Sequence, residues 1–324
     1  MLEGKVPSSL QRCEPLQVLN IGINKIKDTF PCMLKKLYSF HVLVIRSNKF
    51  YGNLQCSVAI QTWSRLQIVD LAYNNFSGAL LPHYFSSWEG MMQGNNPYPW
   101  EQYLSADNLY QDKVTLTIKG LTVEYVKILV VLTSIDFSCN NFQGEIPETL
   151  GDLKSLIHLN FSHNALTGRI PNALGNLIQL ESLDFSVNHL RGRIPDELVS
   201  LTFLAFLNLS FNQLSGRIPS GNQLQTFSAN SFEGNTGLCD LPLKKTCSET
   251  KVNGSSQLLS SHSEHEIEGK YISFALGSSV GFGIIIWLLL HSQRYNELLD
   301  RLLFRMLDRH KKRRMNKIFE GGQV

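Results

Sequence analysis

The side chains that most readily perform chemistry are thinly spread along this chain of 324 residues. His262, His265 and the acidic residues beside them are close together, but they lie in a Ser-rich stretch that predicts a solvated acidic stalk. Such a segment has no second layer of side chains to orient metal ligands. Elsewhere Ser, His and Asp are scattered in the phase of a repeat and converge on no catalytic arrangement. We therefore expect no enzyme activity, no cofactor and no metal site.

The six cysteines predict structural rather than catalytic use. Cys32 and Cys56 are 24 residues apart, and each follows an asparagine, Asn24 or Asn48, by eight residues. If these units stack, the two cysteines lie on neighbouring turns about 5 Å apart, within reach of a disulfide. Other cysteine spacings do not match a zinc site. Cys13 and Cys139 have no evident partner in this pattern, and we interpret both as buried thiols.

The elements that position these side chains are set by a repeat of 24 residues. Asparagines recur at this spacing together with a Gly and an Ile-Pro pair that keep the same phase, at Asn140, Asn164, Asn188 and Asn212. The same frame continues upstream through Asn24, Asn48 and, after two extra residues, Asn74. A period of 20 to 29 with the pattern L-x-x-L-x-L-x-x-N is the signature of leucine-rich repeats.

Each unit of this kind contains a short strand with two different sides. In the unit ending at Asn164, the apolar residues Leu156, Leu159 and Phe161 point inward and become buried only when neighbouring units stack. The alternate residues must face the other way, so we expect outward strand residues to line a concave surface. The repeated Asn supplies amide groups to the backbone at the turn, and we assign it no binding role.

The full pattern L-x-x-L-x-L-x-x-N-x-L-x-G-x-I-P-x-x-L resembles the plant-type leucine-rich repeat, and the order of the remaining segments resembles plant leucine-rich-repeat receptor-like proteins. The resemblance is to the kinase-less group that includes fungal-resistance and xylanase-recognition receptors. It implies an α/β solenoid with an island insertion, followed by a single transmembrane helix. The expected segments are leucine-rich repeats over 1–87 with a partial first unit, the island over 88–131, four repeats over 132–218, a capping segment over 219–247, an acidic Ser-rich stalk over 248–270, the transmembrane helix over 271–290 and a basic amphipathic cytosolic tail over 291–324.

Within the island, Val114, Leu116 and Ile118 alternate with threonines, which predicts a strand or hairpin packed beside the solenoid. Tyr110 followed by Lys119-Gly120 matches the island motif of the family, where the resemblance implies contact with ligand and with a co-receptor ectodomain. A plain turn and a core tyrosine explain these residues equally well.

Two other features of the outer segment bear on binding or closure. Tyr98 and Trp100 lie in a proline-stiffened stretch and are candidate contact residues, although packing against the solenoid would also explain them. The resemblance further implies that Cys239 and Cys247 form a bridge in the capping segment, with Asp240 where the family usually has Gly.

Four sequons permit glycosylation if this part enters the secretory pathway, at Asn75, Asn160, Asn208 and Asn253. Asn160 and Asn208 are at outward strand positions, and glycans on them would cover part of the concave surface. We therefore expect ligand contact on the island or at unglycosylated strand positions, namely Ser182, Asp184 and Ser186.

The stretch from Tyr271 to Leu290 is twenty residues without a charge, long enough to cross a bilayer as a helix. Residues 291–324 carry nine Lys and Arg against four Asp and Glu, so the positive-inside rule places the C-terminus in the cytosol. This predicts a single-pass type I protein of the plasma membrane. Because the first residues lack an apolar signal region, we expect the chain to be an N-terminally truncated product or to come from an incomplete gene model.

Small residues at helical spacing, Ser273, Gly277 and Gly281, form a face against which another helix can pack closely. The resemblance implies that this face docks a partner receptor kinase, although a span that merely tolerates small residues has the same pattern. The tail of 34 residues is too short for a kinase.

The resulting hypothesis is a kinase-less cell-surface receptor that recognises an extracellular protein, peptide or glycan ligand, derived from a pathogen or the cell wall, and signals in defence through a partner kinase. The alternatives are a binding protein that sequesters a ligand or inhibits an enzyme, and a non-functional truncated copy. The weakly acidic outer part disfavours a nucleic-acid partner.

Overall fold

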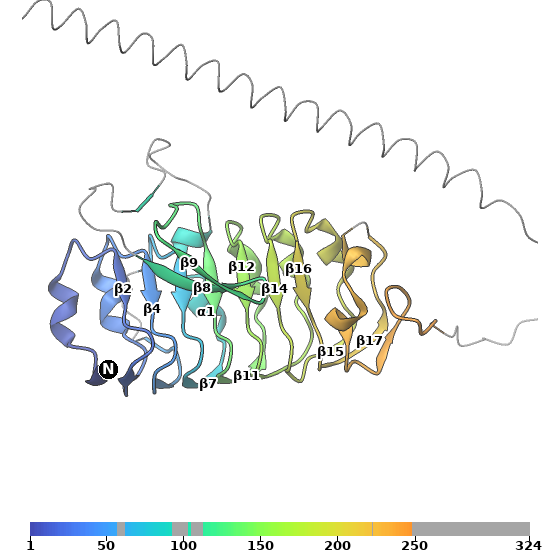
Figure 1. Cartoon of the computed structure of the whole chain (residues 1–324), viewed down its shortest axis with the longest axis horizontal. Coiled ribbons are helices and arrows are strands. Elements are labelled where there is room, and N and C mark those ends of the chain that lie inside the picture. The colour runs from blue at the N-terminus through green and yellow to red at the C-terminus, as the bar shows by residue number, and fades with distance from the viewer. Residues whose placement is uncertain (57–61, 93–102, 105–112, 222, 248–324) are drawn as a thin grey trace, which may run out of the picture. The chain divides into compact units, whose positions relative to one another are not determined.

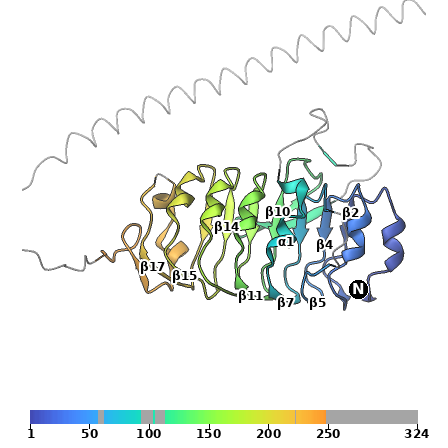
Figure 2. The same cartoon turned by 180° about the vertical axis from the view of Figure 1, so that it is seen from behind.

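The computed structural model describes residues 1–56, 62–92, 103–104, 113–221 and 223–247, all of which belong to one compact unit, Met1–Thr250. This unit is a coil of stacked turns, with strands along one side and short helices along the opposite side (Figures 1 and 2). The predicted leucine-rich-repeat solenoid is confirmed. The predicted transmembrane segment 271–290 lies outside the described residues, and within them no helix has the length and apolar character that a membrane span requires.

The main sheet has seven parallel strands, one from each of seven consecutive turns, and we call its outward surface the strand face. In spatial order the strands are β2 (Val18–Asn20), β4 (Val42–Val44), β6 (Ile68–Asp70), β10 (Ser134–Asp136), β12 (His158–Asn160), β14 (Ser182–Asp184) and β16 (Phe206–Asn208). Strands β6 and β10 are direct neighbours although the island separates them in the sequence. The insertion therefore leaves the stacking of the repeats uninterrupted.

A second set of short parallel strands follows the turn in each unit. These are β1 (Glu3–Gly4), β3 (Lys25–Ile26), β5 (Tyr51–Gly52), β7 (Asn75–Ala79), β11 (Asn141–Glu145), β13 (Ala165–Thr167), β15 (Arg191–Gly192), β17 (Gln213–Arg217) and β18 (Gly237–Cys239). The opposite side of the coil carries α1 (Pro82–Phe85) and the 3-10 helices η1 (Ser8–Arg12), η2 (Cys32–Lys36), η3 (Glu89–Met91), η4 (Glu148–Asp152), η5 (Asn172–Asn176), η6 (Asp196–Ser200), η7 (Leu224–Thr226) and η8 (Ala229–Phe232).

The repeated asparagines form a continuous hydrogen-bonded ladder between turns. The Asn188 amide donates to the carbonyl of Phe161 in the preceding turn at 2.9 Å, and its Oδ1 accepts the backbone N–H of Leu166 at 3.0 Å. The residue before each ladder asparagine from Asn24 to Asn212 has a left-handed backbone with φ between 53° and 55°, which turns the chain out of the strand. The ladder therefore satisfies buried backbone groups, as the spacing predicted.

The core between the two sides is built from the inward-facing Leu, Ile and Phe of every turn. Phenylalanines stack along it, with ring centroids 5.3 Å apart for Phe137 and Phe161 and 5.6 Å apart for Phe161 and Phe185. The first repeats pack in the same cluster through Phe50 and Phe76, so one core runs through the whole unit. This uninterrupted core fixes the spacing of the strands above it.

Both predicted disulfides are present, joining Cys32 to Cys56 and Cys239 to Cys247. The prediction for the remaining thiols was wrong for Cys13, which is exposed at the C-terminal end of η1. Cys139 is half-buried rather than fully buried.

Two segment limits differ from those predicted. Trp88 and Met91 are 2% and 0% exposed within the main core, so the solenoid continues past residue 88 and the inserted segment starts after η3. The capping segment also begins as one more turn: Asn235 continues the ladder by donating to the Leu209 carbonyl at 2.9 Å and accepting from the Leu214 N–H. It follows the previous ladder asparagine by 23 residues rather than 24, which conceals it from a strict periodic search.

The described part of the island forms an antiparallel hairpin of β8 (Val114–Ile118) and β9 (Leu121–Tyr125). Lys119 and Gly120 make its two-residue turn with φ values of 53° and 73°, the left-handed pair that a tight hairpin with the usual strand twist requires. The hairpin lies across the main sheet, in front of its strands in Figure 1. The predicted hairpin therefore exists, and it sits on the strand face.

Candidate functional site

The hairpin seats on the apolar part of the strand face. Its inward residues Val114, Leu116 and Ile118 form a buried cluster with Val42, Val44 and Ile68, the outward residues of β4 and β6, separate from the main core. At the base of the hairpin, the Asn20 side chain donates to the Lys113 carbonyl at 3.4 Å. Apolar outward residues on the early strands thus form the surface on which the hairpin packs.

The turn of the hairpin reaches the last repeats. Lys119 Nζ lies 3.1 Å from a carboxylate oxygen of Glu181, and the Lys119 backbone N–H donates to Ser182 Oγ at 3.3 Å. Gly120 stands against Phe206 of β16, where an added Cβ would lie 3.6 Å from the ring. The hairpin therefore spans from β2 to β16 across the strand face.

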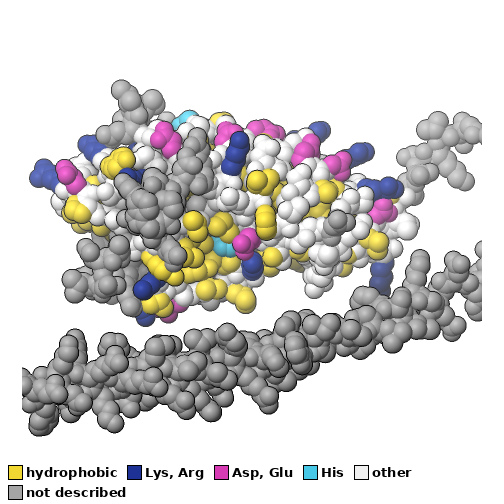
Figure 3. Space-filling view, turned by 90° about the horizontal axis from the view of Figure 1, so that it is seen from above, with side chains coloured by type: hydrophobic (Ala, Val, Ile, Leu, Met, Phe, Trp, Pro, Cys, Tyr) yellow, Lys and Arg dark blue, Asp and Glu magenta, His cyan; other side chains and the backbone are white. Residues whose placement is uncertain are grey.

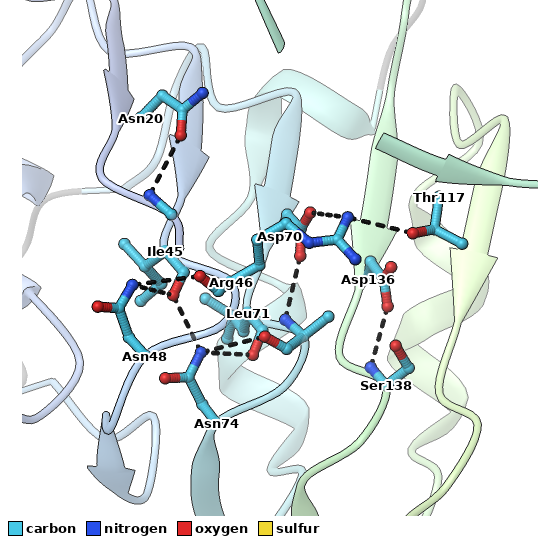
Figure 4. A network of polar contacts seen from close by, with 12 residues as sticks. Asn20, Ile45, Arg46, Asn48, Asp70, Leu71, Asn74, Thr117, Asp136 and Ser138 are labelled. Carbon is cyan, nitrogen blue, oxygen red and sulfur yellow. Dashed lines mark hydrogen bonds and ion pairs between the residues drawn. The ribbon is translucent and has the colours of Figure 1, made fainter. Parts of the chain in front are cut away.

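A buried polar network lies beneath the hairpin (Figure 4). One guanidinium nitrogen of Arg46 is 3.1 Å from a carboxylate oxygen of Asp70 and also donates to Thr117 Oγ1 of β8 at 3.1 Å. Asp136 is the register partner of Asp70 on the adjacent strand. Two carboxylates on neighbouring strands, 1% and 3% exposed, thus lie near one guanidinium, which pairs with Asp70 alone.

The pKa values of these two carboxyl groups are higher than those of surface acids. Burial, together with the nearby Asp136 carboxylate, raises the pKa of Asp70 to about 8 despite the opposing effect of Arg46. Burial likewise raises the pKa of Asp136. Asp136 Oδ1 accepts the Ser138 N–H at 3.0 Å, while its Oδ2 has no hydrogen-bond partner among the described residues. Both carboxyls therefore hold a proton more tightly than surface acids do, and Asp70 also keeps its ion pair with Arg46.

Beside the hairpin turn, a polar cavity of about 260 Å³ opens between the hairpin and strands β10 to β16. Its lining includes Thr117, Ser138, His158, Asn160 and Asp184. His158 is only 6% exposed, its Nδ1 has no partner in the described part of the chain, and burial lowers its pKa to about 4. The imidazole is therefore neutral at physiological pH and presents an unused ring nitrogen.

The last residues of the strands share one local role. Asp136, Asn160, Asp184 and Asn208 each accept the backbone N–H two residues later through Oδ1. The carboxylates among them carry an additional oxygen that this turn does not use. Burial raises the pKa of Asp184, so its charge is also incompletely compensated.

The structure distributes the predicted contact residues unevenly. Lys119 and Gly120 form the hairpin turn, and Asp184 lines the cavity beside it. Ser182 and Ser186 are 5% and 4% exposed, so the expectation of open strand positions was wrong for these two. The hairpin turn covers Ser182, and the Ser186 hydroxyl donates to Asp184 at 2.7 Å.

Other predicted sites are either partly accessible or outside the described residues. Among the sequons, Asn75 is exposed, and Asn160 and Asn208 are half-buried with Oδ1 engaged in the turns described above. The residues of the predicted sites that lie outside the described part are Tyr98, Trp100, Tyr110, Asn253, Ser273, Gly277 and Gly281. In the described ranges no cluster of His, Cys, Asp and Glu is arranged to hold a metal ion.

The sequence analysis did not single out Arg46, Asp70 or Asp136. A signal was available, because the third strand position is Asp or Asn in six of the seven strands and Val44 is the exception. Arg46 also stands where the other turns have Gly, Ala or Ser. Charged residues at such positions indicate a covered strand face.

A coil of parallel strands with a 24-residue unit and an asparagine ladder defines a leucine-rich-repeat protein. Models of the leucine-rich repeat match residues 130–190 and 203–235. The sequence is 50% identical to Receptor-like protein 19 of Arabidopsis thaliana over 87% of this chain, and 48% identical to Receptor-like protein 54 of the same plant over 91%. The chain is therefore related to the plant leucine-rich-repeat receptor-like proteins, and the predicted relationship is confirmed.

The chain spans 30% and 38% of the length of these two relatives. Among solved structures it is similar to the ectodomain of the Arabidopsis thaliana membrane receptor kinase GASSHO1/SCHENGEN3, determined in complex with CASPARIAN STRIP INTEGRITY FACTOR 2, with 27% identity and a TM-score of 0.57. That match covers 76% of this chain and 24% of the receptor ectodomain. A TDR receptor structure matches with 25% identity and a TM-score of 0.52 over 70% of this chain and 32% of that one.

Proposed function

We propose that this chain is part of a kinase-less cell-surface receptor that recognises an extracellular ligand, derived from a pathogen or the plant cell wall, and signals in defence through a partner receptor kinase. The island and the four repeats after it would supply the contact surface. Residues 271–290 would anchor the protein in the plasma membrane, with the basic tail in the cytosol. The chain itself would have no catalytic activity, and the signal would come from the partner.

The observation that carries this proposal is the hairpin seated on the strand face. It fills the apolar part of that face and ends at the last repeats, where a polar cavity stays open beside its turn. The segment that begins in the hairpin also exposes apolar side chains: Leu121, Val126 and Val131 are 68%, 46% and 59% exposed. Figure 3 shows hydrophobic side chains gathered on one stretch of the surface among charged ones. Exposed apolar patches with a polar rim are typical of protein-binding surfaces.

The relatives support the same proposal, because they are receptor-like proteins, and the ectodomain of a receptor kinase that binds CASPARIAN STRIP INTEGRITY FACTOR 2 shares the fold. Association through small residues of the anchor would bring a kinase to the chain.

The test is recovery of receptor kinases with the chain, expressed in leaf cells behind a secretion signal. Replacing Gly277 and Gly281 together with Leu should reduce kinase recovery severalfold, because the added side chains prevent close helix packing. A matched control replaces Ile284 and Ile285 with Leu in the bulky half of the span. Equal recovery with both variants would contradict the docking face. Inhibition of a pathogen enzyme by the purified chain, with no kinase recovered from leaves, would favour the sequestering alternative.

A further inference from the structure

The charges around the hairpin turn do not balance. The titratable side chains on or beside this part of the strand face include the acids Asp70, Asp136, Asp184 and Glu181, the bases Arg46 and Lys119, and His158 and His163 of the cavity lining. Arg46 pairs with Asp70 and Lys119 pairs with Glu181. Asp136 and Asp184 have no ion pair within 4.0 Å among the described residues. The strand face beside the cavity therefore has an excess of carboxylate groups.

The cavity is enclosed by rigid elements rather than by loops alone. Strand ends of β10, β12 and β14 form its floor, and Thr117, Lys119 and Gly120 of the hairpin form one wall. Its volume of about 260 Å³ is smaller than the range typical of pockets for drug-sized molecules. This size suits one long side chain rather than a whole ligand.

The polar atoms at the cavity require hydrogen-bond donors. Ser138 and Ser162 line it with hydroxyl oxygens, which can accept hydrogen bonds. Asp184 contributes a carboxylate and Asn160 an amide from the adjacent strand.

Among common side chains, a guanidinium meets both requirements together. It carries the positive charge that the excess carboxylates lack, and it presents five N–H donors in a plane that can engage a carboxylate and a second acceptor at once. A sugar hydroxyl supplies donors without charge, and an anion would add to the repulsion. The lysine ammonium has the charge but lacks the planar fork.

We propose that the cavity beside the hairpin turn is a subsite for an arginine side chain of a peptide ligand, with Asp184 as the ion-pairing group and the serine hydroxyls of the lining as further acceptors. This inference rests on the proposed function, in which the same face meets an extracellular ligand. It adds the chemical class of the ligand. It also assigns Asp184 as a specificity-determining residue.

The test uses the purified full-length chain and two small probes, N-acetyl-arginine amide and N-acetyl-citrulline amide, which have nearly the same shape and differ in charge. Saturation-transfer NMR detects binding of such weak ligands directly. We expect transfer to the arginine probe and none above background to the citrulline probe. The Asp184→Asn variant keeps the Oδ1 acceptor for the Ser186 N–H and should give arginine signals at least about fivefold weaker.

The control variant is Asp196→Asn, which removes an exposed carboxylate at the start of η6. It should bind the arginine probe as the unchanged chain does. Equal transfer to both probes, or an Asp184→Asn variant with full arginine signal, would overturn the subsite. The probe comparison on the unchanged chain remains informative even if a variant fails to fold. Loss of kinase recovery in leaves would refute the proposed function without altering the probe result, so the two failures are distinguishable.

Discussion

Asp70 and Asp136 are both buried beneath the hairpin. Replacing Asp136 with Asn should stabilise the fold, and replacing Asp70 with Asn should destabilise it. Asn in place of Asp136 retains the acceptor for the Ser138 N–H, and asparagine already fills the same position at Asn160 and Asn208. The change removes a carboxyl whose Oδ2 has no partner and whose pKa burial raises. Asn in place of Asp70 instead removes the group that pairs with Arg46.

The magnitude follows from proton binding. An acid whose pKa is higher in the folded state stabilises the fold fully below its unfolded pKa, and this contribution is lost as pH rises toward the folded pKa. The pKa of Asp70 rises from 3.8 in the unfolded chain to about 8 in the folded chain. Between these two pH values the folded chain therefore binds one proton more than the unfolded chain. Each pH unit in that range removes about 1.4 kcal/mol from the free energy of unfolding. Asp136→Asn removes only the part of this shift that comes from the neighbouring carboxylate and leaves the part that comes from burial, so its advantage over the unchanged chain should grow from pH 5 to pH 7 by less than about 3 kcal/mol.

The assay is urea unfolding of the full-length chain at several pH values, followed by the fluorescence of the buried Trp63 and Trp88. At pH 7 we expect Asp136→Asn to be more stable than the unchanged chain. Asp70→Asn should be less stable by about 1–3 kcal/mol, because it removes a charge-assisted hydrogen bond from the buried Arg46. Equal pH slopes in the unchanged chain and in Asp136→Asn would refute the coupling between the two carboxyl groups. So would equal destabilisation by both substitutions.

Three further outcomes follow from the repeat architecture. Asn188→Ala should lower the free energy of unfolding by about 2–4 kcal/mol in a urea titration, because it leaves buried backbone groups of two turns unpaired; an alanine replacement at an exposed asparagine, with little effect, is the comparison. Replacing Cys32 and Cys56 together with Ser should cost about 3 kcal/mol in the same titration, the value for opening a loop of 24 residues, and an unchanged midpoint would contradict a structural role. A maleimide should label Cys13 rapidly in the native chain and Cys139 slowly, because burial raises the pKa of the Cys139 thiol; mass spectrometry of the labelled peptides distinguishes the two, and equal labelling would contradict the assigned environments.

The repeat made much of the fold predictable because one period of the sequence corresponds to one turn of the solenoid. Once Asn164 and Asn188 are one turn apart, the parallel strands, the ladder and the bridge between Cys32 and Cys56 follow from stacking. The hairpin was also predictable, since alternation over residues 114–118 and the Gly at 120 are local signals.

The surface on which the hairpin packs could not be predicted from these signals. Alternation shows which side of β8 is buried, but not which surface covers it. The contact between Arg46 and Thr117 joins residues 71 positions apart, and no local pattern encodes such a pairing. For the same reason Ser182 could be identified as outward from its strand, while its burial under the hairpin turn could not.

The hairpin also changes how this array should fold. In a simple solenoid each turn touches only its neighbours, so unfolding can begin at an end and progress turn by turn. Here one inserted segment contacts β2 at its base and β14 and β16 at its turn, so the early and late turns are connected directly. We expect the described turns to lose hydrogen-exchange protection together, and Gly120→Asp, which strains the turn and places a charge against Phe206, should restore stepwise loss from the N-terminal end. The insertion thus converts a one-dimensional stack into a single cooperative unit.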